Sequence, residues 1–178
     1  MDEIEAGFTR LTEKIAEMTG KTGKSAETIR ENDVLLLGKM AGLSLPVIQV
    51  IGLNMLEKGK QENNGELYDT VFYPKRMIVL GKTEPVKFRL DDVNKKVDDQ
   101  FCLLGEDGKF YEIMYSSDGF VVDSFLHEIS GKEVLDLYGY EIMFMLYRAM
   151  KDYLKNQETL IEALEKTIDF IFATEKPN

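Results

Sequence analysis

The apolar residues of this 178-residue chain change their spacing twice, and this change constrains the fold more than any other feature. In the first 57 residues they recur every three or four positions, as on one face of a helix. From residue 66 to residue 129 they form short strand-like runs, and after Ser130 the helical spacing returns. We therefore expect an α+β protein with an N-terminal helical unit, a central sheet, and two C-terminal helices packed on that sheet.

The first predicted helix carries a narrow apolar stripe that needs a partner. Its members are separated by alternating steps of four and three residues, which is the spacing of a coiled-coil seam. Such a stripe packs either on the body of its own chain or against a second copy of the protein. Its residues are Ile4, Phe8, Leu11, Ile15 and Met18.

Local stop signals divide the N-terminal region into about three helices. Gly20 and Gly23 interrupt the first helical pattern. Gly42 is suited to end a second helix, and Ser44 is suited to cap a third helix that extends to about residue 57. The boundaries favour a helical unit over residues 1–58.

Residues 37–58 fit a helix-turn-helix template, and a hairpin over residues 66–80 could serve as its wing. This pattern makes a winged-helix nucleic-acid binder one alternative function. The side chains that would contact nucleic acid in that alternative are Ser44, Gln49, Lys58, Lys60, Lys75 and Arg76.

The second unit, residues 66–178, is predicted to hold an antiparallel sheet of about six strands, because the intervals between the runs are too short for parallel crossovers. The polar, glycine-containing segment 58–65 is the best internal linker, so the two units could also form one continuous domain. The two C-terminal helices are expected to separate at residues 156–157. The predicted strands are residues 66–73, 76–80, 86–90, 97–104, 109–115 and 120–129.

The chain has one histidine, His127, and one cysteine, Cys102, which limits its chemistry. A zinc cage, a disulfide framework or a pair of redox cysteines needs several of these residues in one chain. We expect Cys102 and His127 to be structural, and we assign no catalytic residue, metal ligand or cofactor. A single cysteine in a strand-like run also fits a reducing cytoplasm.

The net charge of −10 is concentrated after residue 60, since residues 1–60 carry nine acidic and eight basic side chains. A field of this sign repels nucleic acid, so any such contact would use the N-terminal third. The chain shows neither a basic signal-peptide start nor an uninterrupted apolar stretch of about 20 residues.

We therefore predict a non-enzymatic protein-binding or oligomeric regulatory module of the cytoplasm, which binds itself as a dimer or binds another protein, without a membrane. The first alternative is the winged-helix nucleic-acid binder described above. An enzyme that uses carboxylates and a divalent metal is the second, and its residues cannot be selected from sequence.

Overall fold

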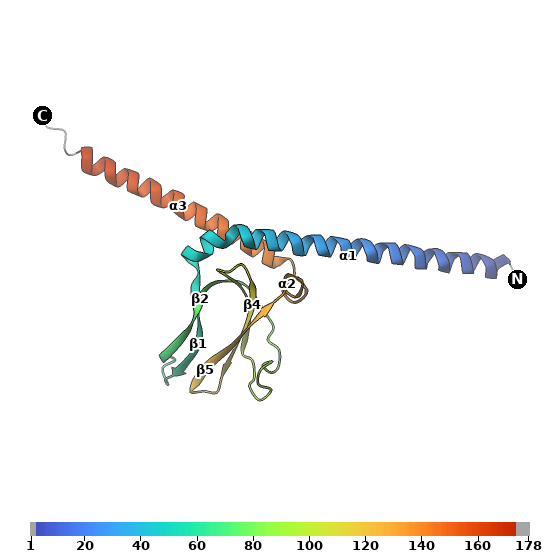
Figure 1. Ribbon diagram of the computed structural model, residues 1–178, viewed down its shortest axis with the longest axis horizontal. Coiled ribbons are helices and arrows are strands. Elements are labelled where there is room, and N and C mark those ends of the chain that lie inside the picture. The colour runs from blue at the N-terminus through green and yellow to red at the C-terminus, as the bar shows by residue number, and fades with distance from the viewer. Residues whose placement is uncertain (1–2, 174–178) are drawn as a thin grey trace.

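The computed structural model describes residues 3–173 as a long helical bar with a small β-barrel attached near its middle (Figure 1). The two ends of the bar come from different helices, so the start of α1 and the end of α3 lie far apart. Side chains are described from Thr9 to Ile171. The elements in chain order are α1 (Glu3–Ile51), β1 (Leu53–Gln61), β2 (Leu67–Thr83), β3 (Asp99–Gly105), β4 (Phe110–Ser117), β5 (Val121–Ile129), α2 (Gly131–Tyr138) and α3 (Glu141–Ala173).

The prediction of three N-terminal helices is wrong, because α1 is one continuous helix of 49 residues. Gly20 and Gly23 lie inside it, where each glycine costs only about 1 kcal/mol relative to alanine. The hydroxyl of Ser44 donates to the carbonyl oxygen of Met40 at 2.8 Å, so Ser44 does not cap a new helix. There is consequently no turn at Gly42 and no helix-turn-helix unit in the described part of the chain.

Tertiary packing explains why α1 continues through these stop signals. Leu37, Ala41, Ser44 and Ile48 follow one another in steps of four, three and four residues, and all four are buried. Their shared face lies against the barrel and the other helices, and such packing supplies most of the stability of a helix in a protein. Breaking the helix at Gly42 would expose this face.

The sheet is a closed barrel of five strands in the order β1-β2-β3-β4-β5, and not an open sheet of about six strands. Every neighbouring pair is antiparallel, including β1 with β5. The long strand β2 has two partners along its length: residues 67–77 pair with β1, whereas residues 77–83 pair with β3.

Two local features account for the wrong strand count. Pro74 was predicted to separate two strands, but it lies inside the long strand β2 close to where that strand changes partners. Residues 86–90 were predicted to be a strand, but they belong to the loop from β2 to β3, where Phe88 and Lys96 form an isolated bridge. The predicted linker, residues 58–65, comprises the end of β1 and the turn into β2.

The buried side chains form two layers on opposite faces of the strands. Inside the barrel, Met77, Leu103 and Ile113 are fully buried. On the outer face, strand residues such as Leu104 pack against the helices. Successive residues of a strand point to opposite faces, so the side chains of β3 and β4 are buried or half-buried along nearly their whole length. The outer layer also contains Leu37, Ile48, Val134, Ile142 and Leu146.

Two helices follow β5, but they separate at Gly139 and not at residues 156–157. Ser130 and Glu133 form a capping box at the start of α2, in which the Ser130 hydroxyl accepts from the backbone N–H of Glu133. Gly139 has a φ of 72°, a conformation that residues with a Cβ rarely adopt. This turn allows α3 to leave the barrel in a new direction.

Candidate functional site

The two ends of the helical bar project away from the barrel, and we call them the helical arms. The α1 arm comprises residues 9–32 and the α3 arm comprises residues 158–171, and every side chain in these ranges is exposed. Figure 1 shows the arms pointing in opposite directions from the barrel. The arms are therefore the parts of the described chain with the least support from the rest of the molecule.

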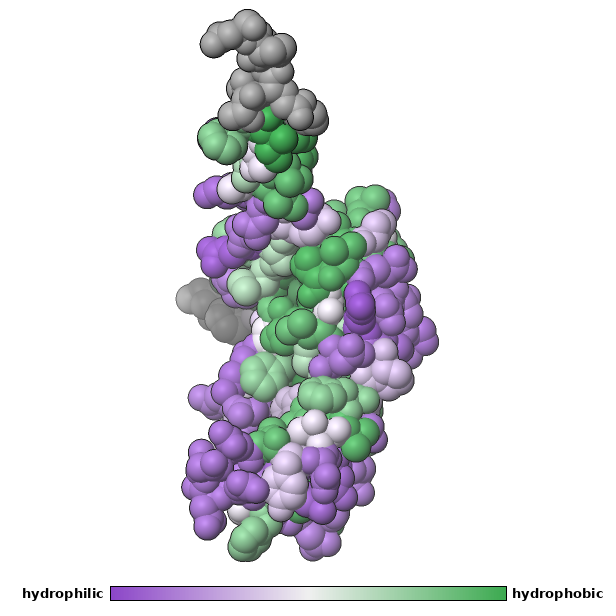
Figure 2. Space-filling model, turned by 90° about the vertical axis from the view of Figure 1, so that its left-hand side faces the viewer, coloured by the Kyte–Doolittle hydropathy of each residue, from purple (hydrophilic) through white to green (hydrophobic). Residues whose placement is uncertain are grey.

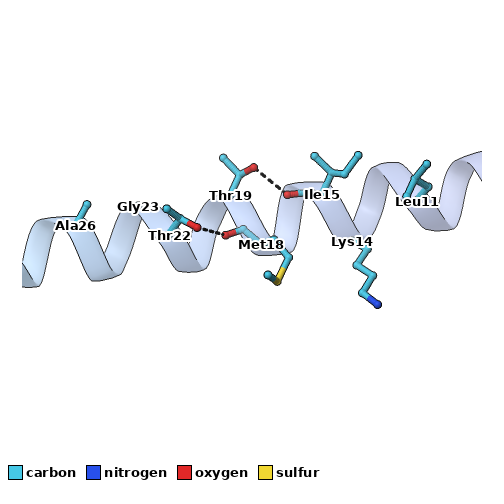
Figure 3. Close-up of a pocket in the computed structure, with 8 residues that line it drawn as sticks. All are labelled: Leu11, Lys14, Ile15, Met18, Thr19, Thr22, Gly23 and Ala26. Carbon is cyan, nitrogen blue, oxygen red and sulfur yellow. Dashed lines mark hydrogen bonds between the residues drawn. The ribbon is translucent and has the colours of Figure 1, made fainter.

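An apolar stripe runs along α1, and its outer part from Leu11 to Met18 has the heptad-like spacing predicted from the sequence. Its members, which we call the α1 stripe, are between 48% and 84% exposed. A pocket lies beside Leu11, Ile15 and Met18. Figure 3 shows that all eight residues that line this pocket belong to α1, so the pocket is the solvent-exposed side of a single helix. The side chains of Ile4 and Phe8 lie outside the described residues. The α1 stripe is Leu11, Ile15, Met18, Ile29, Leu36 and Leu43.

A second stripe follows α3 with steps of seven, three and four residues. We call Leu154, Ile161, Leu164 and Ile168 the α3 stripe, and they are 52% to 59% exposed. Figure 2 looks along the bar from the α3 side and shows hydrophobic side chains along this helix and where the helices meet the barrel. Both ends of the bar thus present the same kind of surface.

The composition of the α1 arm makes an isolated helix unstable there. An isolated helix is marginal in water even when it is rich in alanine, and Gly20 and Gly23 weaken this one further. The hydroxyls of Thr19 and Thr22 donate to carbonyl oxygens one turn earlier, at 2.9 Å each. Thr22 lies between Met18 and Ile29 on the same face of the helix. Because its hydroxyl already donates to a carbonyl oxygen of α1, a partner can cover Thr22 without leaving this donor unpaired.

Three residues of the nucleic-acid alternative lie where α1 joins the barrel. Ser44 is buried, and Arg76 donates from Nη1 to the backbone oxygen of Gln49 at 2.5 Å. Ser44 and Arg76 therefore serve contacts within the chain. Without a helix-turn-helix unit, no recognition helix is available to place Gln49 against a base edge.

The three lysines of that alternative do not gather on one surface. Lys75 donates to Asp107 at 2.6 Å and to the hydroxyl of Tyr111. Lys60 pairs with Asp69 at 3.0 Å on the β1–β2 hairpin. Lys58 lies with β5 at the end of the barrel away from the helices. The basic side chains are thus dispersed, and two of the three are neutralised by carboxylates.

Cys102, Glu112 and His127 are cross-strand neighbours on β3, β4 and β5. Glu112 is buried and accepts from Gln100 Nε2 at 2.7 Å and from the Tyr138 hydroxyl at 2.5 Å, while His127 Nε2 lies 3.5 Å from its other oxygen. Burial, and then the charge of Glu112, raise the pKa of the Cys102 thiol to about 12. Burial and the bond to Glu112 also raise the pKa of Tyr138.

Cys102, Glu112 and His127 do not have the arrangement of a site for nucleophilic catalysis. Cys102 and His127 are separated by one intervening strand, which places their backbones roughly 10 Å apart. The residue between them is a carboxylate, which opposes thiolate formation rather than removing the thiol proton. Glu112 was not selected from the sequence, and the available signal was one acid within the apolar run 110–115.

No group of three or more His, Cys, Asp or Glu side chains with metal-binding geometry is found among the described residues. The carboxylate and divalent-metal enzyme therefore has no candidate site in that part of the chain. No protein-family model matches the sequence, and neither the curated proteins nor the solved structures contain a significant match.

One stretch within Thr9–Ile51 is long and apolar enough to cross a membrane. That result rests on length and composition alone. Only 22% of the stretch is buried inside the structure, whereas the core helix of a soluble protein that passes the same test is mostly buried. In this stretch Leu37, Ala41 and Ile48 are buried against the rest of the chain. A bilayer could surround it only if these contacts were given up.

Proposed function

We propose that the protein is a non-enzymatic module of the cytoplasm that associates with a second copy of itself through its helical arms. The observation that carries this proposal is the α1 stripe, which stays exposed in the single chain. It has apolar residues at both heptad positions from Leu11 to Met18 and at one of the two positions from Ile29 to Leu43. Sustained heptads of this kind are typical of helices that pair with other helices. Buried, free Cys102 is compatible with a reducing compartment.

The size of the stripes indicates that both arms are needed. Burying a leucine or isoleucine side chain contributes about 1.5–3 kcal/mol, so a half-exposed one contributes roughly 1 kcal/mol. The α1 stripes of two copies then contribute on the order of 10 kcal/mol. Association itself costs about 4–15 kcal/mol, so the α1 stripes alone come close to balance. The α3 stripes supply the remaining stabilisation.

Insertion into a membrane is the competing explanation for the same apolar surface. The exposed side chains of the α1 arm are interspersed with charges such as Lys14, Glu17 and Lys21, and Lys21 pairs with Glu17 at 2.6 Å. The α1 arm, residues 9–32, thus has only a narrow apolar face. A narrow seam favours a second helix over a surrounding lipid phase.

The test is the mass of the protein in solution, measured by light scattering after size exclusion at tens of micromolar. We expect the wild type to elute as a dimer. Ile15→Asp combined with Met18→Asp, which buries charge in the seam, is expected to give a monomer. Ala16→Asp places one carboxylate on the opposite face of the same turn and is the control, so it should remain dimeric.

A second pair of changes, Ile161→Asp with Ile168→Asp, tests the α3 arm and is expected to weaken the dimer as well. A wild-type monomer mass at these concentrations would contradict the proposal. So would a wild-type protein that needs detergent and floats with lipid vesicles, because that result would assign the apolar surface to a membrane.

A further inference from the structure

A pocket at the end of the barrel away from the helices brings together side chains from three strands and a loop. Ser116, Asp123 and Lys58 are cross-strand neighbours on β4, β5 and β1, so their side chains share one face. The loop segment 94–96 also lines the pocket, which has a volume of about 380 Å³. Small-molecule sites have volumes of about 300–1,000 Å³, so this pocket is large enough to hold a ligand.

Ser116 has an unused hydrogen-bonding group in this wall. The residue is only 6% exposed, and its hydroxyl has no hydrogen-bond partner among the described residues. Buried polar atoms in folded proteins nearly always have a partner, so one without a partner needs an explanation. A ligand in the pocket would supply the missing bond.

The carboxylates beside the pocket are already engaged. Asp123 accepts from Arg89 at 2.7 Å and also pairs with Lys95. Asp118 accepts from the backbone N–H groups of Phe120 at 3.1 Å and Val121 at 2.7 Å. Asp123 is thus paired with two cations, whereas the hydrogen bonds to Asp118 occupy its Oδ1 atom and leave its negative charge in place.

Two lysines that line the same pocket are left without such a partner. Lys58, on β1, and Lys96, in the loop, form no ion pair with any residue that the structure describes. The pocket therefore combines a buried hydroxyl with two ammonium groups that form no ion pair within the described chain. This set of donors suits an anion that has several acceptor oxygens.

We propose that this pocket binds a phosphate group, carried by a small organic phosphate or as the free ion. A tetrahedral phosphate presents acceptors in several directions, so it can contact Lys58, Lys96 and Ser116 from its different oxygens. The remaining volume accommodates a short organic chain. This site lies on the barrel and not on the arms, so it is independent of self-association.

The test is isothermal titration calorimetry with three probes: inorganic phosphate, glycerol 3-phosphate and, as the uncharged control, glycerol. We expect the two phosphates to bind and glycerol not to bind. Lys58→Gln combined with Lys96→Gln should weaken binding about tenfold or more. Ser116→Ala should weaken it about three- to tenfold, as the loss of one hydrogen bond does. Lys87→Gln removes one exposed charge outside the pocket and should leave binding unchanged.

The probes distinguish the two sources of the phosphate group. Tighter binding of glycerol 3-phosphate assigns the site to an organic phosphate, whereas equal affinities assign it to the free ion, and both results support the proposal. Absence of phosphate binding would overturn it. Equal losses in the Lys87→Gln protein and in the pocket variants would also overturn it, because they would show only the effect of net charge.

Discussion

The thiol of Cys102 is expected to be almost inert while the protein is folded. Cys102 is fully buried in the outer core layer, between the strands and the helices. Burial first, and then the nearby charge of Glu112, raise the pKa of this thiol from 9.0 to about 12. The thiolate is the reactive form, so both its population and its accessibility are reduced.

The magnitude follows from these two effects. At a fixed neutral pH, a rise in pKa from 9.0 to about 12 lowers the thiolate fraction about a thousandfold. A reagent must also wait for an opening of the outer layer, and global unfolding of a domain has a free energy of about 5–15 kcal/mol. We therefore expect native Cys102 to react at least about a thousand times more slowly than the same thiol in the unfolded chain.

The assay follows the reaction with an aromatic disulfide reagent at neutral pH, in buffer and in concentrated guanidinium. The Cys102→Ala protein is the blank, since it has no other thiol. A native rate within about tenfold of the unfolded rate, with the fold intact by circular dichroism, would refute the reasoning and show that the outer layer opens easily at β3.

The other predictions concern the core and the β2–β3 loop. Leu104→Ala is expected to lower the free energy of unfolding by about 2–5 kcal/mol, because Leu104 is fully buried, whereas Leu90→Ala should change it by less than about 0.5 kcal/mol, because Leu90 is 64% exposed. Similar losses in urea titrations of the two proteins would contradict the two-layer core. The hydrogen bond from Arg89 lowers the pKa of Asp91 below its usual value of 3.8. This interaction therefore stabilises the folded chain above that pH, and the stabilisation is lost as pH falls through the lower folded value. Amide exchange of loop 84–98 should accelerate in that acidic range for the wild type, and an unchanged acid response in Asp91→Asn would count against the assignment.

The spacing of apolar residues predicted the positions of most helices and strands. It did not predict where each one ends or which ones are continuous. The stripe through Leu11, Ile15 and Met18 was visible in the sequence, and the structure confirms that it lies on one face of a helix. The predicted end of that helix was wrong, because the helix-breaking effects of Gly20, Gly23 and Gly42 are local and weak. Packing at Leu37, Ala41 and Ile48 outweighs them.

The same limit applies to the strands. Pro74 is a strong local break, and it was predicted to end a strand. β2 nevertheless continues through it and exchanges β1 for β3 as its partner. Closure of the barrel removes the free edges of the sheet, and this gain depends on strands that are distant in sequence. Residues 53–57, predicted as the end of a helix, belong to β1 for the same reason.

The sequence by itself determined two things about this protein. One cysteine and one histidine rule out a metal cage or a disulfide framework within the chain, and the heptad spacing requires a helix with an apolar seam. Both conclusions depend only on residue type and local spacing. The tertiary structure alone decided which distant residues meet, such as Glu112 with Cys102, and Ser116 with Lys58 on the face shared by β4, β5 and β1. Which residues become cross-strand neighbours depends on strand register, and the packing of the whole barrel sets this register rather than any one segment.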